Sequence, residues 1–110
     1  MNTPAFGLPE HALETVRDIL ASCPEVETAL IYGSRAMGTQ RPGSDIDLTL
    51  LGADLGEQQL SEISTRLDES DIPYLVDLSL HKNIDNAGLL AHIARVGQVF
   101  YVRSPKLVRD

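Results

Sequence analysis

Residues 32–48 combine two features that carry chemistry, a Gly-Ser turn and a pair of aspartates. Asp45 and Asp47 are spaced i, i+2, so on a β-strand both carboxylates project from one face, about 6–7 Å apart. Carboxylate oxygens suit hard cations such as Mg²⁺, and this spacing suits two cations about 3.5–4 Å apart. Gly33-Ser34 follows an apolar run, where a turn into a helix offers backbone N–H groups and a hydroxyl to phosphate oxygens. The combination indicates phosphoryl or nucleotidyl transfer.

A third aspartate and two arginines extend this set. Asp77 lies inside the apolar run Tyr74–Leu80, where an unpaired buried carboxylate would be costly. If Asp77 shares a metal ion with the aspartate pair, that cost is removed. The alternative interpretation is that Asp77 is an ordinary aspartate at the rim of a strand and binds no metal. Arg35 and Arg41 are the charged residues of segment 31–44. Either can bind triphosphate oxygens or pair with surface acids, and we expect the substrate contact from Arg35.

The elements that must position these residues follow from hydrophobic periodicity and turn residues. Alternating apolar residues predict strands, and the 3.6-residue period predicts amphipathic helices, whereas Arg41–Ser44 has the sequence of a type II turn. Ser34 is expected to cap the short helix that follows the glycine turn. The predicted order is helix Pro9–Ser22, strand Thr28–Tyr32, short helix Ser34–Met37, strand Asp45–Leu51, helix Glu57–Ser70, strand Tyr74–Leu80, a helix capped by Asp85 or Asn86 and ended by Gly97, and strand Val99–Val102.

This order predicts an α/β protein, a small mixed sheet with helices packed mainly on one side. The 110 residues are expected to form a single domain, 1–110, with a loosely held tail at 104–110. The net charge of −7 argues against a broad nucleic-acid-binding surface. A single cysteine excludes an internal disulfide, and no apolar run approaches the length of a membrane span. We therefore expect a cytoplasmic protein, and the sequence leaves open a homo-oligomer. His92 stands between two apolar residues and is expected to be only a packed or exposed helix residue.

The motif residues carry a family resemblance. Gly33-Ser34, ten intervening residues and Asp45-x-Asp47 are similar to the signature of nucleotidyltransferases related to DNA polymerase β. The wording GSRA followed by SDIDL, in a short chain, resembles the minimal nucleotidyltransferase (MNT) branch. The resemblance extends from about residue 13 to residue 101 and implies the polymerase-β-like fold. It also implies transfer of a nucleoside monophosphate, AMP from ATP, with release of pyrophosphate.

The resemblance implies a role for each motif residue. Asp45, Asp47 and Asp77 would hold two Mg²⁺ ions, and Asp77 would also orient or deprotonate the attacking hydroxyl. Gly33 and Ser34 would bind the β- and γ-phosphates. Minimal members of the family typically pair with a helical HEPN protein, so the resemblance also implies such a partner, an antitoxin role and AMP-modification of the partner.

Two other functions are compatible with the sequence. An interaction module of the same fold would neutralise its partner by binding alone, and loss of a carboxylate would favour it. All three aspartates are present, which favours the enzyme. A nucleotidyltransferase acting on small molecules is disfavoured by the chain length, because such enzymes usually carry a further domain for the acceptor.

Overall fold

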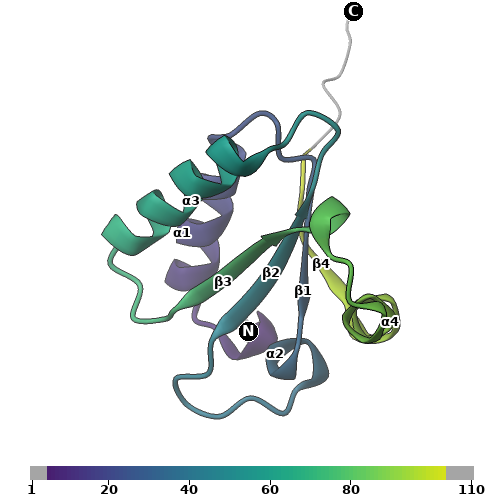
Figure 1. The fold of residues 1–110 in the computed structure, drawn as a ribbon. Coiled ribbons are helices and arrows are strands. Elements are labelled where there is room, and N and C mark those ends of the chain that lie inside the picture. Colours follow the sequence, from purple (N-terminus) through teal and green to yellow (C-terminus); the bar gives the residue numbers. More distant parts are fainter. Residues whose placement is uncertain (1–4, 104–110) are drawn as a thin grey trace, which may run out of the picture.

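The computed structural model describes residues 5–103, which fold into a four-stranded sheet with helices on both faces (Figure 1). The four α-helices and four strands run in the order expected from the sequence, with two short 3₁₀ helices added. The elements are η1 (Ala5–Gly7), α1 (Glu10–Ala21), β1 (Thr28–Tyr32), α2 (Ser34–Met37), β2 (Ile46–Leu51), α3 (Glu57–Glu69), β3 (Val76–Leu80), η2 (His81–Asn83), α4 (Ala87–Val96) and β4 (Gln98–Val102).

The sheet is mixed, and its strand order is β3-β2-β1-β4. Strand β1 pairs antiparallel with both β2 and β4, whereas β2 pairs parallel with β3. The parallel pair needs a crossover, and α3 supplies it. The sequence prediction of a small mixed sheet is therefore confirmed.

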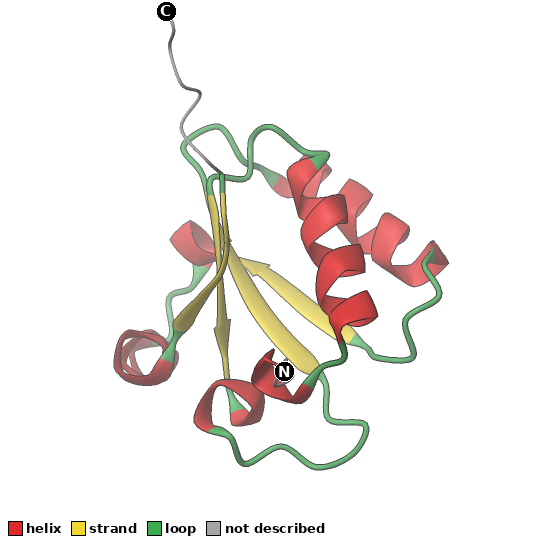
Figure 2. Cartoon of the chain, turned by 180° about the vertical axis from the view of Figure 1, so that it is seen from behind, coloured by secondary structure: helices red, strands yellow, loops and turns green. Residues whose placement is uncertain are grey.

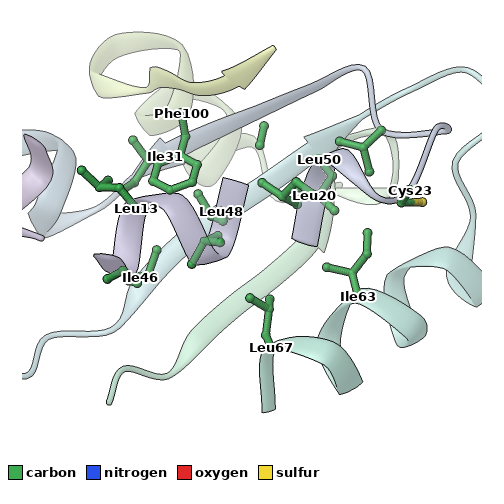
Figure 3. Packing of buried hydrophobic residues seen from close by; sticks show 14 of the residues in the cluster. Leu13, Leu20, Cys23, Ile31, Ile46, Leu48, Leu50, Ile63, Leu67 and Phe100 are labelled. Carbon is green, nitrogen blue, oxygen red and sulfur yellow. The ribbon is translucent and has the colours of Figure 1, made fainter. Parts of the chain in front are cut away.

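One face of the sheet is covered by α1 and α3, which lie side by side (Figures 1 and 2). The fully buried apolar residues of β1 and β2 stand at alternate positions, so a single face of each strand enters the core. Figure 3 shows this cluster between the two helices and the sheet. Its larger members include Leu13, Leu20, Ile31, Ile46, Leu48, Leu50, Ile63, Leu67 and Phe100.

Helix α4 lies against the opposite face of the sheet, at the end of β1 (Figure 1). Its N-cap is Asn86, whose side chain accepts a hydrogen bond from the Leu89 N–H at 2.9 Å. Gly97 follows the helix in an extended conformation, φ −63° and ψ 143°, so the helix runs directly into β4 without a left-handed C-terminal glycine. Helices are thus mainly, but not only, on one side.

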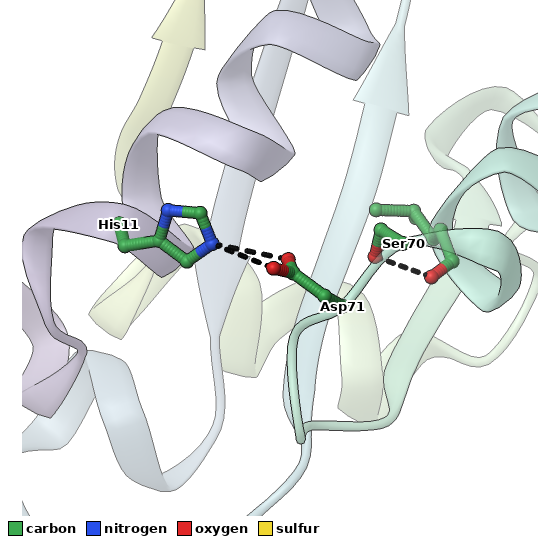
Figure 4. Close-up of polar contacts among 4 residues, drawn as sticks. His11, Ser70 and Asp71 are labelled. Carbon is green, nitrogen blue, oxygen red and sulfur yellow. Dashed lines mark hydrogen bonds and ion pairs between the residues drawn. The ribbon is translucent and has the colours of Figure 1, made fainter.

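The connections have identifiable causes. The Arg41–Ser44 turn is closed by a 3.0 Å hydrogen bond from the Ser44 N–H to the Arg41 carbonyl, and Gly43 has φ +82°, as a type II turn requires. In β4 the pairing register shifts at Phe100, which turns into the core. Figure 4 shows His11 of α1 against Asp71 after α3, with 3.0 Å between Nε2 and Oδ1. Both side chains are mostly exposed, so this contact contributes little to stability.

Strand boundaries differ from the expected ones by one or two residues. Asp45 lies just before β2, and residues 74–75 lie before β3. The tail at 104–110 lies outside the described residues. Within residues 5–103, none of the helices has both the length and the apolar character needed to cross a membrane.

The core predicts a sharp difference between two leucines. Leu48 is fully buried, so Leu48→Ala should lower the free energy of unfolding by about 2–5 kcal/mol. Leu75 is 71% exposed, and Leu75→Ala should change the free energy of unfolding by less than about 0.5 kcal/mol. Urea denaturation followed by circular dichroism measures both. Equal losses in the two variants would contradict the assignment of β2 to the core.

Candidate active site

The sheet registers bring the predicted aspartates together on the face opposite α1 and α3. Tyr32 of β1 is paired with Asp47 of β2, and Asp47 is paired with Asp77 of β3. These three side chains form one row across three strands, because residues directly opposite in a sheet project from the same face. Asp45 stands two residues before Asp47, on the same side. The site is therefore built on strands, and the predicted carboxylates share one surface.

The Gly33 turn lies directly against this row. Gly33 has φ +75° and ψ −155°, a conformation that L side chains rarely adopt. A Cβ atom at this position would overlap the Oδ2 atom of Asp47, so only glycine lets the backbone approach the carboxylate. Gly33, not Ser34, is the N-cap of α2, and Ser34 is its first residue. The expected capping role of Ser34 is wrong, because the positive φ places the start of the helix one residue earlier.

The backbone of the turn leaves hydrogen-bond donors at the start of α2. The first bonds of the helix run from the N–H groups of Ala36 and Met37 to the Gly33 carbonyl, each 3.1 Å long. The N–H groups of Ser34 and Arg35 precede these bonds and have no acceptor within the helix. The turn therefore leaves two amides and the Ser34 hydroxyl at the start of α2, directly after the glycine that lies against Asp47.

The carboxylates are close enough to repel one another. Burial raises the pKa of Asp47, and the negative charges of Asp77 and Asp45 raise it further, whereas His92 opposes the shift. Asp45 and Asp77 are exposed at the two ends of the group. Among residues 5–103, no three His, Cys, Asp or Glu side chains are placed closely enough to enclose a metal ion as they stand. The site is thus a concentration of negative charge on an open surface.

A strip of hydroxyl groups lies beside the carboxylate row. Thr49 and Ser79, one step further along β2 and β3, are paired in the sheet, and the Ser79 hydroxyl donates to the Thr49 hydroxyl at 2.9 Å. Burial raises the pKa of Tyr32; a hydrogen bond with Ser79 lowers it, and the charges of Asp77 and Asp47 raise it again. Tyr32 is therefore a neutral phenol at physiological pH, with its hydroxyl next to the carboxylates.

His92 is the site residue that the sequence did not reveal. Its Nε2 accepts a hydrogen bond from the Gly33 N–H at 3.2 Å, so this nitrogen carries no proton in that contact. The ring also packs edge-on against Tyr32, with 6.1 Å between the ring centroids. Gln98, just after α4, donates to the Ala36 carbonyl at 2.8 Å. Two side chains from the C-terminal part of the chain thus hold the glycine turn and α2.

Arg35 lies beneath the turn rather than at its surface. Its side chain is only 3% exposed, and its guanidinium donates to the carbonyls of Phe6, Gly7 and Ser44 over 2.8–3.3 Å. It also lies 5.0 Å from the centre of the Tyr74 ring. The structure therefore does not bring the Arg35 side chain to the nucleotide site as expected. The reason is that its donors satisfy three partly buried backbone carbonyls, which belong to two separate segments of the chain.

Comparison with known families decides the class of the protein. The model of the family described as Polymerase beta, Nucleotidyltransferase matches residues 14–106. The chain belongs to this family. The resemblance predicted from the Gly-Ser and Asp-x-Asp spacing is confirmed at this level, whereas no curated protein is similar enough to count as a match.

Solved structures share the fold at low sequence identity. A toxin–antitoxin complex with AMP-PNP is 23% identical at a TM-score of 0.67, covering 84% of this chain and 74% of that chain. The toxin–antitoxin MntA–HepT is 18% identical, with a TM-score of 0.63 and coverages of 86% and 74%. A tri-AMPylated Shewanella oneidensis HEPN toxin in complex with MNT antitoxin is 20% identical at a TM-score of 0.56, covering 84% of this chain and 68% of that chain. These neighbours agree with the polymerase-β-like nucleotidyltransferase fold.

The contacts of Arg35 predict a structural role. Arg35→Met removes the buried donors and leaves carbonyl groups unpaired, so the free energy of unfolding should fall by about 3 kcal/mol. Arg41→Met, on the exposed turn of the same loop, should change it by less than about 0.5 kcal/mol. Urea denaturation of both variants provides the measurement. If Arg35→Met is as stable as the parent, the guanidinium does not support the loop.

Proposed function

We propose that this protein transfers AMP from ATP to a hydroxyl group of a partner protein. The observation that carries the proposal is the row of carboxylates beside a glycine turn, in a chain that belongs to a nucleotidyltransferase family. Asp45, Asp47 and Asp77 are the proposed catalytic residues. Gly33 and Ser34 are the proposed nucleotide-binding residues, and the Arg35 side chain is left out of this role.

The donor set fits a hard divalent cation. The three proposed ligands are carboxylates, and Mg²⁺ prefers oxygen ligands. The raised pKa of Asp47, caused by burial and by the neighbouring charges of Asp77 and Asp45, also supports a cation at this site. A bound cation would neutralise the charges that repel one another. Asp45, Asp47 and Asp77 would hold two Mg²⁺ ions, and the metal would supply charge neutralisation on the phosphates.

The chain's own groups have distinct roles in this reaction. The Gly33 turn and the Ser34 hydroxyl would bind the β- and γ-phosphates, whose close approach requires a residue without a side chain. The acceptor oxygen forms a bond to the α-phosphorus, and the bond from that phosphorus to the α–β bridging oxygen breaks. Pyrophosphate leaves with the electron pair, and Asp77 takes the hydroxyl proton.

The proposed partner is a HEPN-type protein. The support is indirect: structural neighbours with the same fold include an MNT antitoxin in complex with an AMPylated HEPN toxin. By analogy, this chain would act as the antitoxin of a pair and modify a hydroxyl of its toxin. The proposal keeps the expected cytoplasmic location and the single domain of residues 1–110.

One observation favours a second function. Arg35, which the sequence suggested as a cation for the triphosphate, is occupied by backbone carbonyls. A site with less positive charge binds a nucleotide less tightly, so the alternative is a catalytically silent module that neutralises its partner by binding alone. The two functions differ in whether the carboxylates matter.

The first functional prediction concerns the aspartate pair. Asp45→Asn combined with Asp47→Asn should weaken binding of MgATP by more than about 100-fold, since loss of even outer-shell partners costs about 10–100-fold in metal affinity. Isothermal titration calorimetry measures binding, and circular dichroism reports the fold. Asp54→Asn, an exposed aspartate beyond β2, is the matched control and should bind as the parent does. Unchanged binding in the double variant would exclude a metal role for the pair.

The second prediction separates the enzyme from the silent module. Asp77→Asn keeps the size of the side chain but removes its charge and basic oxygen, so AMP transfer should fall by roughly 100-fold or more. The measurement is incorporation of labelled AMP into the co-purified partner, beside an assay of partner inhibition. Asp68→Asn, exposed on α3, is the control. Full inhibition by Asp77→Asn, with no incorporation by the parent, would establish the silent module instead.

A further inference from the structure

A groove lies at the edge of the sheet, between α3 and the edge strand β3. Its volume is about 410 Å³, and its lining includes Val76, Asp77 and Leu78 from β3. Ser61 and Ser64 from α3 form part of the opposite wall. Asp77 lines this edge groove, and its register with Asp47 also places it in the proposed catalytic row, which projects from the sheet face opposite α3.

The β3 wall offers unpaired backbone groups. Strand β3 is at the edge of the sheet, and the Ile46 N–H donates to the Leu75 carbonyl at 2.9 Å. In a parallel pair, alternate residues bond to the neighbouring strand, so the backbone groups of Asp77 point toward β2. The N–H and C=O groups of Val76 and Leu78 then point away from β2, along the free edge. Such an edge is a template for one more extended strand.

The direction of the proposed reaction selects the same side. The phosphates would lie at Gly33, next to β1, and the attacking and leaving oxygens of phosphoryl transfer lie roughly in line. The acceptor must then approach from the side opposite β1, which is the β3 side of the row. Beyond β1, α4 packs on the same side as the phosphates, and its His92 contacts both Tyr32 and Gly33, so this side leaves less room for a second substrate. This step depends on the proposed function.

We infer that the groove binds an extended segment of the acceptor protein that carries the modified hydroxyl. The segment adds to the free edge of β3 and places its hydroxyl beside Asp77. Among the described residues, the charged groups that line the groove are Glu57 and Asp77. The adjoining hollow on α3 adds two acids and one base, Glu62, Glu69 and Arg66, so the charge along this surface stays negative. A segment with lysine or arginine on both sides of the hydroxyl residue matches this negative lining.

The test uses nuclear magnetic resonance of the full ¹⁵N-labelled chain, with the peptide Lys-Val-Tyr-Val-Lys as the probe. At saturating peptide, the amide signals of Val76 and Leu78 should shift. Their hydrogen exchange should slow by about fivefold or more, the effect of one added hydrogen bond. The peptide Glu-Val-Tyr-Val-Glu should bind at least about tenfold more weakly, because like charges repel. Equal binding of both peptides, or shifts that map away from β3 and α3, would overturn the inference.

Two arginine variants make the test specific. Ser61 is exposed and lines the groove, so Ser61→Arg fills it and adds a positive charge on a helix that tolerates arginine. We expect about tenfold weaker binding of the basic peptide. Gln58→Arg adds the same charge at an exposed position of α3 outside the groove lining, and should change binding by less than about twofold. Equal effects of the two variants would overturn the inference.

A titration of the same labelled protein with MgATP separates the two proposals. Shifts at Gly33 and Ser34 test nucleotide binding independently of the peptide. If MgATP shifts these signals and the peptide leaves Val76 and Leu78 unaffected, docking at β3 is wrong and the proposed function stands. If the peptide binds at β3 and MgATP shifts nothing, the groove is a docking site and the transferase function is wrong.

Discussion

The pairing register between β1 and β2 is the constraint on which the site depends. It sets Tyr32 opposite Asp47 and brings the next residue, Gly33, against the Asp47 carboxylate. A shift of one residue would turn every side chain of β2 to the other face, sending Leu48 out of the core and Asp47 into it. Because burial of an unpaired carboxylate is costly, core packing itself enforces the register. The hydrophobic core and the candidate site are therefore specified by the same alternation.

The site itself opposes folding, and the surrounding contacts offset this. Burial raises the pKa of Asp47, and repulsion from the charges of Asp77 and Asp45 raises it further. The glycine turn between β1 and α2 is held instead by distant residues, His92 at the Gly33 N–H and Gln98 at the Ala36 carbonyl. Both contacts are hydrogen bonds to backbone groups, so they fix the turn from outside the carboxylate row. The turn is thus positioned before any ligand arrives, as a preorganised site requires.

The sequence predicted most of the fold because its signals are local. Alternation defined β1 and β2, the helical period defined α1 and α3, and Pro42-Gly43 defined the type II turn. The Asp-x-Asp pair was also visible, since i, i+2 spacing is a property of one strand. The contacts of His92 were not visible in the sequence. Its ring accepts a hydrogen bond from Gly33, 59 residues away, and its sequence neighbours are ordinary helix residues. The buried position of the Arg35 side chain was not visible for the same reason, because its carbonyl acceptors at Phe6 and Gly7 are 29 and 28 residues away.

The two edges of the sheet differ in a way that bears on how a partner chain can approach. At the β4 edge the register shifts at Phe100, and Arg17 already donates to the Phe100 carbonyl at 2.8 Å. A bulge of this kind twists an edge and makes regular pairing with another strand unfavourable. At the β3 edge the register is continuous from Val76 to Leu80. The regular edge is also the one that carries Asp77, so the geometry that discourages pairing at β4 leaves an extended segment free to pair beside the carboxylates.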